Sequence, residues 1–293
     1  IPSTAGVSSL PAINAGVVKN KGFEIELEHR KNFRDWGYAI KGNFSYATNE
    51  IISADEPVNE EKPWQLRTGT HIDEVYGYIA EGLFQTWDEI NDASIAKTTA
   101  SNLQPGDIRY KDLNNDGKIN DDDRGYLGKI STPDKIVGLS LRGNWKNLDL
   151  SVLFQGALGG YTWFSGSAIW PFESKASVSA DVLNNYWSSN NTDEENADVF
   201  YPRLSSDHSD NNFMESTYWL KSSDYLRLKN IEIGYRLSKK VTKALGVAEV
   251  RIYANGVNLI TWDHMKIFDP ESPGGAINYP QMKVFNFGIH ASF

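Results

Sequence analysis

The last ten residues of the chain alternate between apolar and polar side chains, and this pattern constrains the fold more than any other feature. Apolar residues occupy every second position: Phe285, Phe287, Ile289, Ala291 and Phe293. Successive side chains of a β-strand point to opposite faces of a sheet, so one face of this segment is wholly apolar. A strand of about 10 residues can cross a bilayer as part of a barrel. The segment therefore predicts the last strand of a membrane barrel, with the last strand of a soluble β-sandwich as the alternative.

The composition is compatible with a membrane barrel and excludes several other classes. The 293 residues carry a net charge of −9, which argues against a broad phosphate-binding surface and hence against a nucleic-acid partner. The chain has no cysteine, so it has no disulfide, thiolate metal site or cysteine nucleophile. Its 9 Trp and 14 Tyr suit the aromatic girdles of a barrel, although a large soluble β protein has similar usage.

The sequence contains no apolar run long enough for a transmembrane helix, which needs about 18 residues. It opens on Ile1 without a methionine or a signal peptide. We therefore expect a mature or truncated product, or part of a longer protein.

Several other segments alternate in the same way and predict an all-β fold of about eight strands. These segments are residues 22–29, 38–46, 137–145, 148–155, 226–237 and 250–256, and residues 75–86 contain a further short strand-like stretch. Residues 146–147 read as a tight hairpin turn, and a change of phase near residues 229–230 indicates a β-bulge. Residues 50–73 and 94–107 read as loops, and helical turns are expected only at residues 88–94 and 179–187.

The two faces of these strands are expected to meet different solvents. Lipid would contact the apolar faces, which hold Phe23, Ile25, Leu27, Leu148, Leu150, Val152, Phe285, Phe287 and Phe293. A water-filled lumen would contact the polar faces, which hold Glu24, Glu26, Lys41, Arg142, Asn286 and His290. Three glutamates on one face of residues 22–29 support this division, because buried unpaired charge is costly.

Residues 157–223 break all periodicity and are expected to form a long loop region. Long loops are rare in compact soluble domains but common on one side of outer-membrane barrels. The region is rich in aromatic residues, for which girdle or loop packing is the plainer role. The alternative is stacking on a sugar or contact with a partner protein, with these candidates: Trp163, Trp170, Phe172, Trp187, Tyr201 and Trp219.

Residues 112–123 have the spacing of a calcium-binding loop. Its ligand positions are occupied by Asp112, Asn114, Asp116, Lys118 through its carbonyl, Asn120 and Asp123. Gly117 permits the sharp turn at position six, and a hard cation requires six to eight oxygens. The spacing predicts structural Ca²⁺, with Mg²⁺ as the second choice and a solvated acidic turn as the plainer alternative. No clear amphipathic helices flank the loop, so a Ca²⁺ sensor is not expected.

No catalytic arrangement stands out, and we expect a protein that is not an enzyme. The five histidines are scattered without metal-ligand spacing, and no phosphate loop or nucleophile elbow is present. Acidic pairs are too numerous to locate or exclude a glycosidase pair. No organic cofactor is expected.

Motifs spread along the whole chain resemble the C-terminal part of SusC/RagA-type TonB-dependent transporters of Bacteroidota. The motifs, in the family's order, are Asn20-Lys-Gly-Phe-Glu24, Pro105-Gly-Asp-Ile108 before the acidic loop, Tyr225-Leu-Arg-Leu-Lys-Asn230, Asn258-Leu259, Asp269-Pro-Glu271, Tyr279-Pro280 and Phe293. The resemblance implies that residues 1–293 are the C-terminal portion of a transmembrane antiparallel β-barrel with about 22 strands and a plugged lumen. The plug, the TonB box and the first half of that barrel have no counterpart here.

The resemblance also implies partners and a location. It implies energy from the TonB complex, a SusD-like surface lipoprotein as a lid, and a location in the bacterial outer membrane with extracellular loops. The imported ligand would be an oligosaccharide or a peptide, and the sequence does not choose between them. The competing hypotheses are a secreted calcium-stabilised β-sandwich that binds glycan or accompanies an enzyme, and a free-standing eight-stranded barrel.

Overall fold

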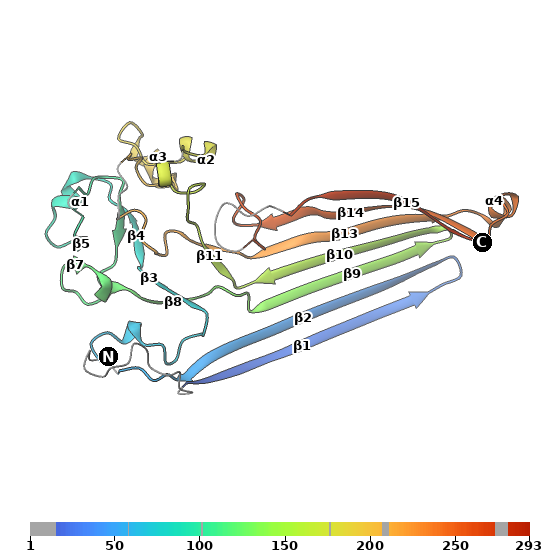
Figure 1. Ribbon diagram of the computed structural model, residues 1–293, viewed down its shortest axis with the longest axis horizontal. Coiled ribbons are helices and arrows are strands. Elements are labelled where there is room, and N and C mark those ends of the chain that lie inside the picture. Colours follow the sequence, from blue (N-terminus) through green and yellow to red (C-terminus); the bar gives the residue numbers. More distant parts are fainter. Residues whose placement is uncertain (1–15, 58, 101, 176, 207–210, 273–280) are drawn as a thin grey trace, which may run out of the picture.

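The computed structural model describes residues 16–57, 59–100, 102–175, 177–206, 211–272 and 281–293. Its largest element is one seven-stranded sheet in which every neighbouring pair is antiparallel (Figure 1). The strands, in spatial order, are β1 (Val17–Asn32), β2 (Trp36–Ser53), β9 (Lys135–Trp145), β10 (Leu148–Leu158), β13 (Tyr225–Arg236), β14 (Glu249–Asp263) and β15 (Val284–Ser292). The alternating segments of the sequence therefore correspond to the strands of a single sheet, and most strands are longer than predicted.

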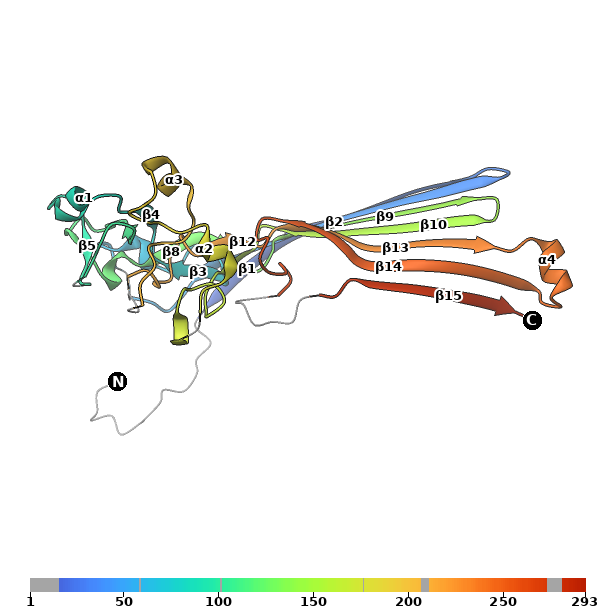
Figure 2. The ribbon, with the colours of Figure 1, turned by 90° about the horizontal axis from the view of Figure 1, so that it is seen from above.

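The short connections between strands lie at one end of the sheet, and the long connections lie at the other end. At one end the chain reverses through residues 33–35, residues 146–147 and a connection that contains α4 (Lys239–Ala244). The long connections gather at the opposite end, and Figure 2 shows them beyond the sheet, away from the C-terminus. We call residues 54–134, 159–224 and 264–272 the loop domain, within the described part of the chain. Short turns at one end and long loops at the other are typical of outer-membrane barrels.

The strand register makes one face of the sheet apolar across all seven strands. One row across β2 to β15 consists of Trp36, Trp145, Leu148, Tyr235, Ile252 and Ile289. Leu27 and Phe287 on this face are 72% and 83% exposed, so no second layer covers them among the described residues. This arrangement removes the basis for the soluble β-sandwich, in which a facing sheet would bury those side chains.

The opposite face of the sheet is polar. It holds the residues that were predicted from the sequence to face a water-filled lumen. Arg251 joins β10 to β13 and β14, because its guanidinium contacts both Asp149 and Glu232. His290 is the register partner of Arg251, which confirms its place on the polar face. Gly288 lies beneath the ring of Tyr253, where an added Cβ would come within 2.4 Å of a ring atom. The glycine therefore allows a large side chain to lie flat on this face.

A β-bulge in β13 keeps the two faces separate. Leu153 and Phe154 of β10 pair with Asn230 and Leu228, which leaves Lys229 as the extra residue opposite β10. Apolar residues precede the bulge at even positions and follow it at odd positions, beginning with Ile231. The bulge absorbs this change of phase, so Leu228 and Ile231 share the apolar face. The bulge predicted from the sequence is confirmed.

The hydrophobic core of the described chain lies in the loop domain, outside the large sheet. The buried cluster consists of Tyr78, Ile108, Tyr110, Ile119, Phe164, Ile169, Val182, Tyr201, Trp219 and Met265. It draws together two connections that are far apart in sequence, residues 54–134 and 159–224. The connections that the sequence predicted as loops at residues 94–107 and 157–223 contain only short elements, and aromatic residues pack them into one folded unit.

The loop domain contains eight short strands in two-stranded sheets, so the predicted count of about eight strands was too low. Its elements are η2 (Pro63–Gln65), β3 (Glu74–Gly77), β4 (Ala80–Leu83), α1 (Trp87–Asn91), β5 (Lys97–Thr98), β6 (Ile108–Tyr110), β7 (Lys118–Ile119), η3 (Asp121–Asp123), β8 (Gly125–Ile130), β11 (Tyr161–Trp163), η4 (Glu173–Lys175), α2 (Ala180–Leu183), α3 (Asp193–Asp198) and β12 (Leu220–Ser222). Helical turns were expected near α1 and α2, whereas α3 and α4 were missed. No helix in the described ranges is both long enough and apolar enough to cross a membrane.

Candidate functional site

The calcium-type loop folds as a tight series of turns around its own backbone. Asn114 Oδ1 accepts the backbone N–H of Asp116 at 3.0 Å, and Asp116 Oδ1 accepts that of Lys118 at 2.8 Å. Asp112 Oδ2 accepts the N–H of Gly117 at 2.8 Å. Side chains of alternate residues therefore turn inward, which is the arrangement that such a loop needs in order to present oxygens to a cation.

The donor atoms of the loop are only partly free. Asp112 Oδ1 is buried and has no hydrogen-bond partner, as expected for an oxygen that can take a cation. Asp123 instead accepts the backbone N–H groups of Leu113 and Asn120, at 2.8 and 2.9 Å. As a result, no group of three or more acidic or histidine side chains is poised for a metal ion within the described residues.

The surroundings of Asp116 in this loop nevertheless favour its negatively charged form. A hydrogen bond from the Asn114 amide, together with one from the Lys118 backbone N–H, lowers the pKa of Asp116 below its ordinary value. The far end of the loop is fixed to η2, where the Trp64 indole donates to the Asp122 carbonyl at 2.9 Å. Lys62 also forms an ion pair with Asp122. Residues 112–123 are therefore anchored to the loop domain at one end, while the Asp112 end keeps a free oxygen.

The aromatic candidates divide into buried and accessible residues. Tyr201 and Trp219 are completely buried in the core, and Trp187 is buried beside it. The burial of these three residues fits the plainer role of loop packing, and it leaves no surface for the alternative of contact with a ligand or partner. Trp163 and Trp170 are half-buried at the edge of the core, and Phe172 is 37% exposed.

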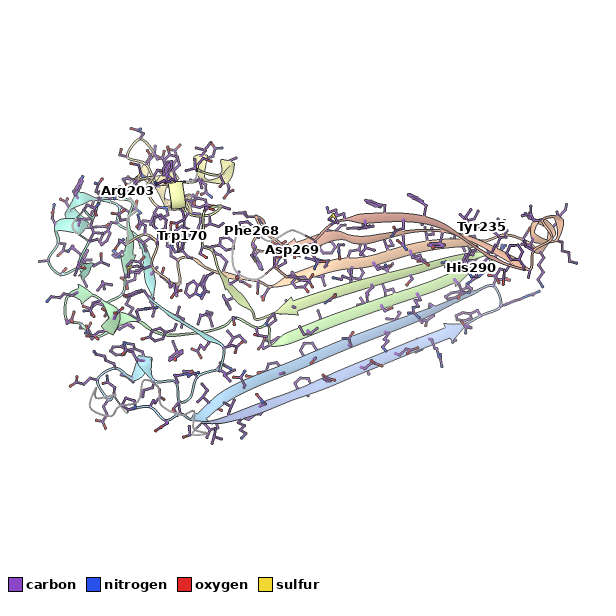
Figure 3. The ribbon with its side chains drawn as sticks, in the orientation of Figure 1. Trp170, Arg203, Tyr235, Phe268, Asp269 and His290 are labelled. Carbon is purple, nitrogen blue, oxygen red and sulfur yellow. The ribbon has the colours of Figure 1, made fainter. Side chains whose placement is uncertain are left out.

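A buried polar network fixes the two long connections to each other. Asp107, which is buried, pairs with Arg203 at 2.7 Å and accepts the Asn212 amide at 2.8 Å. Asn212 Oδ1 accepts the backbone N–H of Ile108, and its carbonyl accepts the Trp219 indole at 2.7 Å. Three of these contacts join residues about 100 positions apart in the sequence, and the bond between Asn212 and Trp219 lies within the core. Figure 3 shows Arg203 and Trp170 within this domain.

A second charged cluster lies where the sheet meets the loop domain. Arg227 of β13 is only 1% exposed and contacts Asp269 at 2.7 Å and Glu271 at 2.5 Å. Tyr225 donates its hydroxyl to Glu271 at 2.6 Å, and Lys229 approaches the same carboxylate at 3.6 Å. Figure 3 places Asp269 at this end of the sheet, with Tyr235 and His290 near the other. The ion pairs therefore hold residues 269–271 against the polar face.

Sequence reasoning assigned no role to this cluster. Its residues belong to two of the motifs that carried the resemblance, residues 225–230 and 269–271, and two carboxylates beside a prolyl residue were a usable signal. What the sequence lacked was the proximity of two segments about 40 positions apart. The Tyr279-Pro280 motif lies outside the described residues.

A pocket of about 490 Å³ opens beside the cluster. Its lining includes Val75, Ser131, Pro133, Ala157, Tyr161, Thr162, Trp163, Ser223, Tyr225, Pro270 and Glu271. Ala157 and Tyr225 are register partners on the polar side of the sheet. The pocket therefore joins the polar face to the loop domain.

An antiparallel sheet with an exposed apolar face, short turns at one end and a folded loop domain at the other is typical of part of an outer-membrane barrel. No protein-family profile matches the chain. Over its whole length it is 29% identical to TonB-dependent receptor P3 of Formosa agariphila, of which it covers 30%. It is 24% identical to TonB-dependent receptor SusC of Bacteroides thetaiotaomicron and covers 28% of that protein.

Solved structures give the same result for the fold. The structure of the RagAB peptide transporter aligns with 100% of this chain, and the aligned part is 31% of the RagAB chain. The TM-score is 0.71 and the sequence identity is 23%. These comparisons confirm the predicted resemblance: the chain is similar to the C-terminal part of SusC/RagA-type TonB-dependent receptors. It spans about 30% of the length of the relatives that it matches. Those relatives are receptors and transporters, in agreement with the prediction of a protein that is not an enzyme.

Proposed function

We propose that this chain forms part of the barrel of an outer-membrane importer. The carrying observation is the exposed apolar face, which continues through seven strands and ends in aromatic residues. From Trp36 to Tyr46 the strand rises about 33 Å, and a tilt of about 40° reduces this to about 25 Å across the membrane. That height matches the apolar band of outer-membrane barrels, which is about 25 Å tall.

In this proposal, further strands pair with the free edges of β1 and β15 and close a barrel of about 22 strands. Closure satisfies edge groups that hydrocarbon cannot. The loop domain, including residues 112–123 and 159–223, lies outside the cell. A SusD-like lipoprotein covers the mouth, the TonB complex supplies energy through the rest of the receptor, and the cargo is an oligosaccharide or a peptide. The similarity to SusC and RagAB supports this assignment.

The test is growth that depends on the full-length receptor. A strain that lacks the receptor should grow more slowly on at least one defined mixture of oligosaccharides or peptides as sole carbon source. A strain that lacks TonB should show the same defect, and the intact receptor gene should restore growth only when TonB is present. Equal growth of all strains on every mixture would contradict the proposal.

We also propose that residues 112–123 bind structural Ca²⁺. Asp112, Asn114, Asp116 and the Lys118 carbonyl would supply oxygens first, with Asn120 and Asp123 completing the set. The ion would supply a fixed positive charge that neutralises the acidic turns and rigidifies the loop. The free, buried Oδ1 of Asp112 supports this proposal.

Calorimetric titration of the full-length receptor with CaCl₂ tests the ion site. We expect saturable binding that Asp112→Ala abolishes, and slower proteolysis of the loop domain in Ca²⁺ than in chelator. Asp88→Ala is the matched control, because Asp88 lies in the first turn of the short helix α1, outside the loop. Equal titrations of the wild type and Asp112→Ala would reject the site.

A further inference from the structure

The pocket between the sheet and the loop domain has the size of a ligand site. Its volume of about 490 Å³ lies within the range of about 300–1,000 Å³ that is usual for such sites. Aromatic and prolyl side chains form much of its wall: Pro133, Tyr161, Trp163, Tyr225 and Pro270. Rigid walls of this kind lose little conformational freedom when a ligand binds.

The polar groups of the wall are already engaged with one another. The Tyr225 hydroxyl donates to Glu271 Oε1 at 2.6 Å, and Glu271 Oε2 accepts Arg227 at 2.5 Å. The Gln281 amide donates to the same Oε2 at 2.7 Å. On the other side, the Tyr161 hydroxyl accepts the ammonium of Lys129 at 3.1 Å. A guest in this pocket therefore meets apolar surface and few free hydrogen-bonding groups.

The small number of free hydrogen-bonding groups in the pocket distinguishes between the possible classes of ligand. A sugar ring carries several hydroxyls, and each one that is buried without a partner costs free energy. An apolar side chain makes no such demand and gains free energy from burial. An acyl chain arrives through the bilayer, whereas Ala157 and Tyr225 place the pocket on the polar side of the sheet.

We propose that this pocket receives the apolar side chain of an imported peptide, an inference that rests on the importer function proposed above. Trp163 and Tyr161 supply the faces against which the side chain packs. Pro270 closes one side, because Arg227 holds its neighbours Asp269 and Glu271 by ion pairs. Arg227 is thus a positioning residue, and the wall exists before the ligand arrives.

The experiment compares three probes on the full-length receptor in detergent, by calorimetric titration. They are the blocked pentapeptide Gly-Gly-Phe-Gly-Gly, its Gly-Gly-Ser-Gly-Gly analogue and maltohexaose. Full burial of a phenylalanine side chain corresponds to about 10-fold to 100-fold in affinity, so we expect the first peptide to bind more tightly than the second by such a factor. We expect no measurable binding of maltohexaose at this pocket.

Two variants test whether the preference arises in the pocket. Trp163→Ala removes part of the wall and Val75→Trp fills the space, so both should reduce the preference for phenylalanine to less than about threefold. Trp87→Ala is the matched control, since Trp87 lies on α1, is 56% exposed and does not line the pocket. It should leave the preference unchanged.

Three results would overturn the inference: equal binding of the two peptides, no binding of either peptide, or maltohexaose binding that Trp163→Ala weakens. Failure of the importer function is detected separately, because growth would then not depend on the receptor or on TonB. A receptor that supports growth but shows no phenylalanine preference refutes the pocket assignment alone.

Discussion

Arg227 illustrates how one buried charge organises its surroundings. A guanidinium can contact two carboxylates at once, and here it holds Asp269 and Glu271, which follow β14 in the chain. A buried charge that loses its partner is strongly destabilising, whereas exposed pairs contribute little. The contrast between Arg227 and the half-exposed Arg236 of the same strand makes this difference measurable.

Arg227→Met should release residues 264–272 from the sheet. It removes the guanidinium that holds Asp269 and Glu271 and leaves Glu271 only the 3.6 Å approach of Lys229, at a cost of about 3–5 kcal/mol. We expect rapid cleavage in this segment during limited proteolysis of the full-length receptor. Arg236→Met, the same substitution at an exposed pair, should leave the cleavage rate unchanged, and equal rates for the two variants would refute the role given to Arg227.

Lys221 provides a pH-dependent test within the loop domain. Burial lowers the pKa of its ammonium to about 8. The side chain lies 3.8 Å above the centre of the Phe200 ring. Between pH 8 and the ordinary lysine value of about 10.4, the unfolded chain holds a proton that the folded chain has released, so raising the pH through this interval stabilises the loop domain.

Competitive acetylation of the folded receptor, followed by mass spectrometry, gives this pKa directly. The labelling midpoint of Lys221 should lie near pH 8, well below the ordinary lysine value of about 10.4. In Lys221→Met the stabilisation with rising pH should be absent. A midpoint for Lys221 near the ordinary lysine value of about 10.4 would disprove the effect of burial.

Strand β13 shows how one extra residue determines which face of the sheet the side chains of a strand occupy. If Lys229 occupied a regular strand position instead of a bulge, the apolar residues on its two sides would fall on opposite faces, since a shift of one position inverts every side chain. Tyr225 and Arg227 would then turn to the apolar face, away from Glu271.

Deletion of Lys229 should therefore be tolerated, because Leu228 and Ile231 then stand two positions apart on the apolar face, whereas deletion of Glu232 should impair assembly because it moves Ile233 and Tyr235 to the polar face. The measurement is the amount of heat-modifiable receptor in the outer-membrane fraction. We expect near-wild-type amounts when Lys229 is deleted and little when Glu232 is deleted. Equal amounts of the two deletion variants would contradict the role given to the alternation of β13.

The elements also show which parts of the structure the sequence encodes locally. The hairpin of β9 and β10, strand β15 and the bulge at Lys229 were predictable because alternation is a property of neighbouring residues. The loop domain was not, because its contacts join residues such as Asp107 and Asn212, which no local pattern connects. The pairing of Arg227 with Glu271 was missed for the same reason, although both residues stood in recognised motifs.

At the scale of the whole molecule, the two faces of the sheet should respond oppositely to charge. Leu139 and Ser140 are neighbours on β9 that point to the apolar and polar faces. Leu139→Arg should cost about 2–4 kcal/mol if lipid covers that face, whereas Ser140→Arg should be tolerated in a wet lumen.

The amount of each variant in the outer membrane and its resistance to unfolding in urea give the comparison. We expect Leu139→Arg to assemble poorly or unfold at lower urea, and Ser140→Arg to match the wild type. If both variants behave alike, hydrocarbon does not distinguish the two faces, and the membrane interpretation of the sheet is wrong.

The shared core of the loop domain links two pairs of sheet strands, because it is built from the long connections between them. The connection from β2 to β9 and the connection from β10 to β13 bury their aromatic residues in one cluster and exchange hydrogen bonds through Asp107 and Asn212. Neither connection can move outward alone without exposing that cluster to water. Grafting one of them into a related receptor would consequently disrupt both, so exchanges of specificity at this surface should succeed only when the two segments are transplanted as a pair.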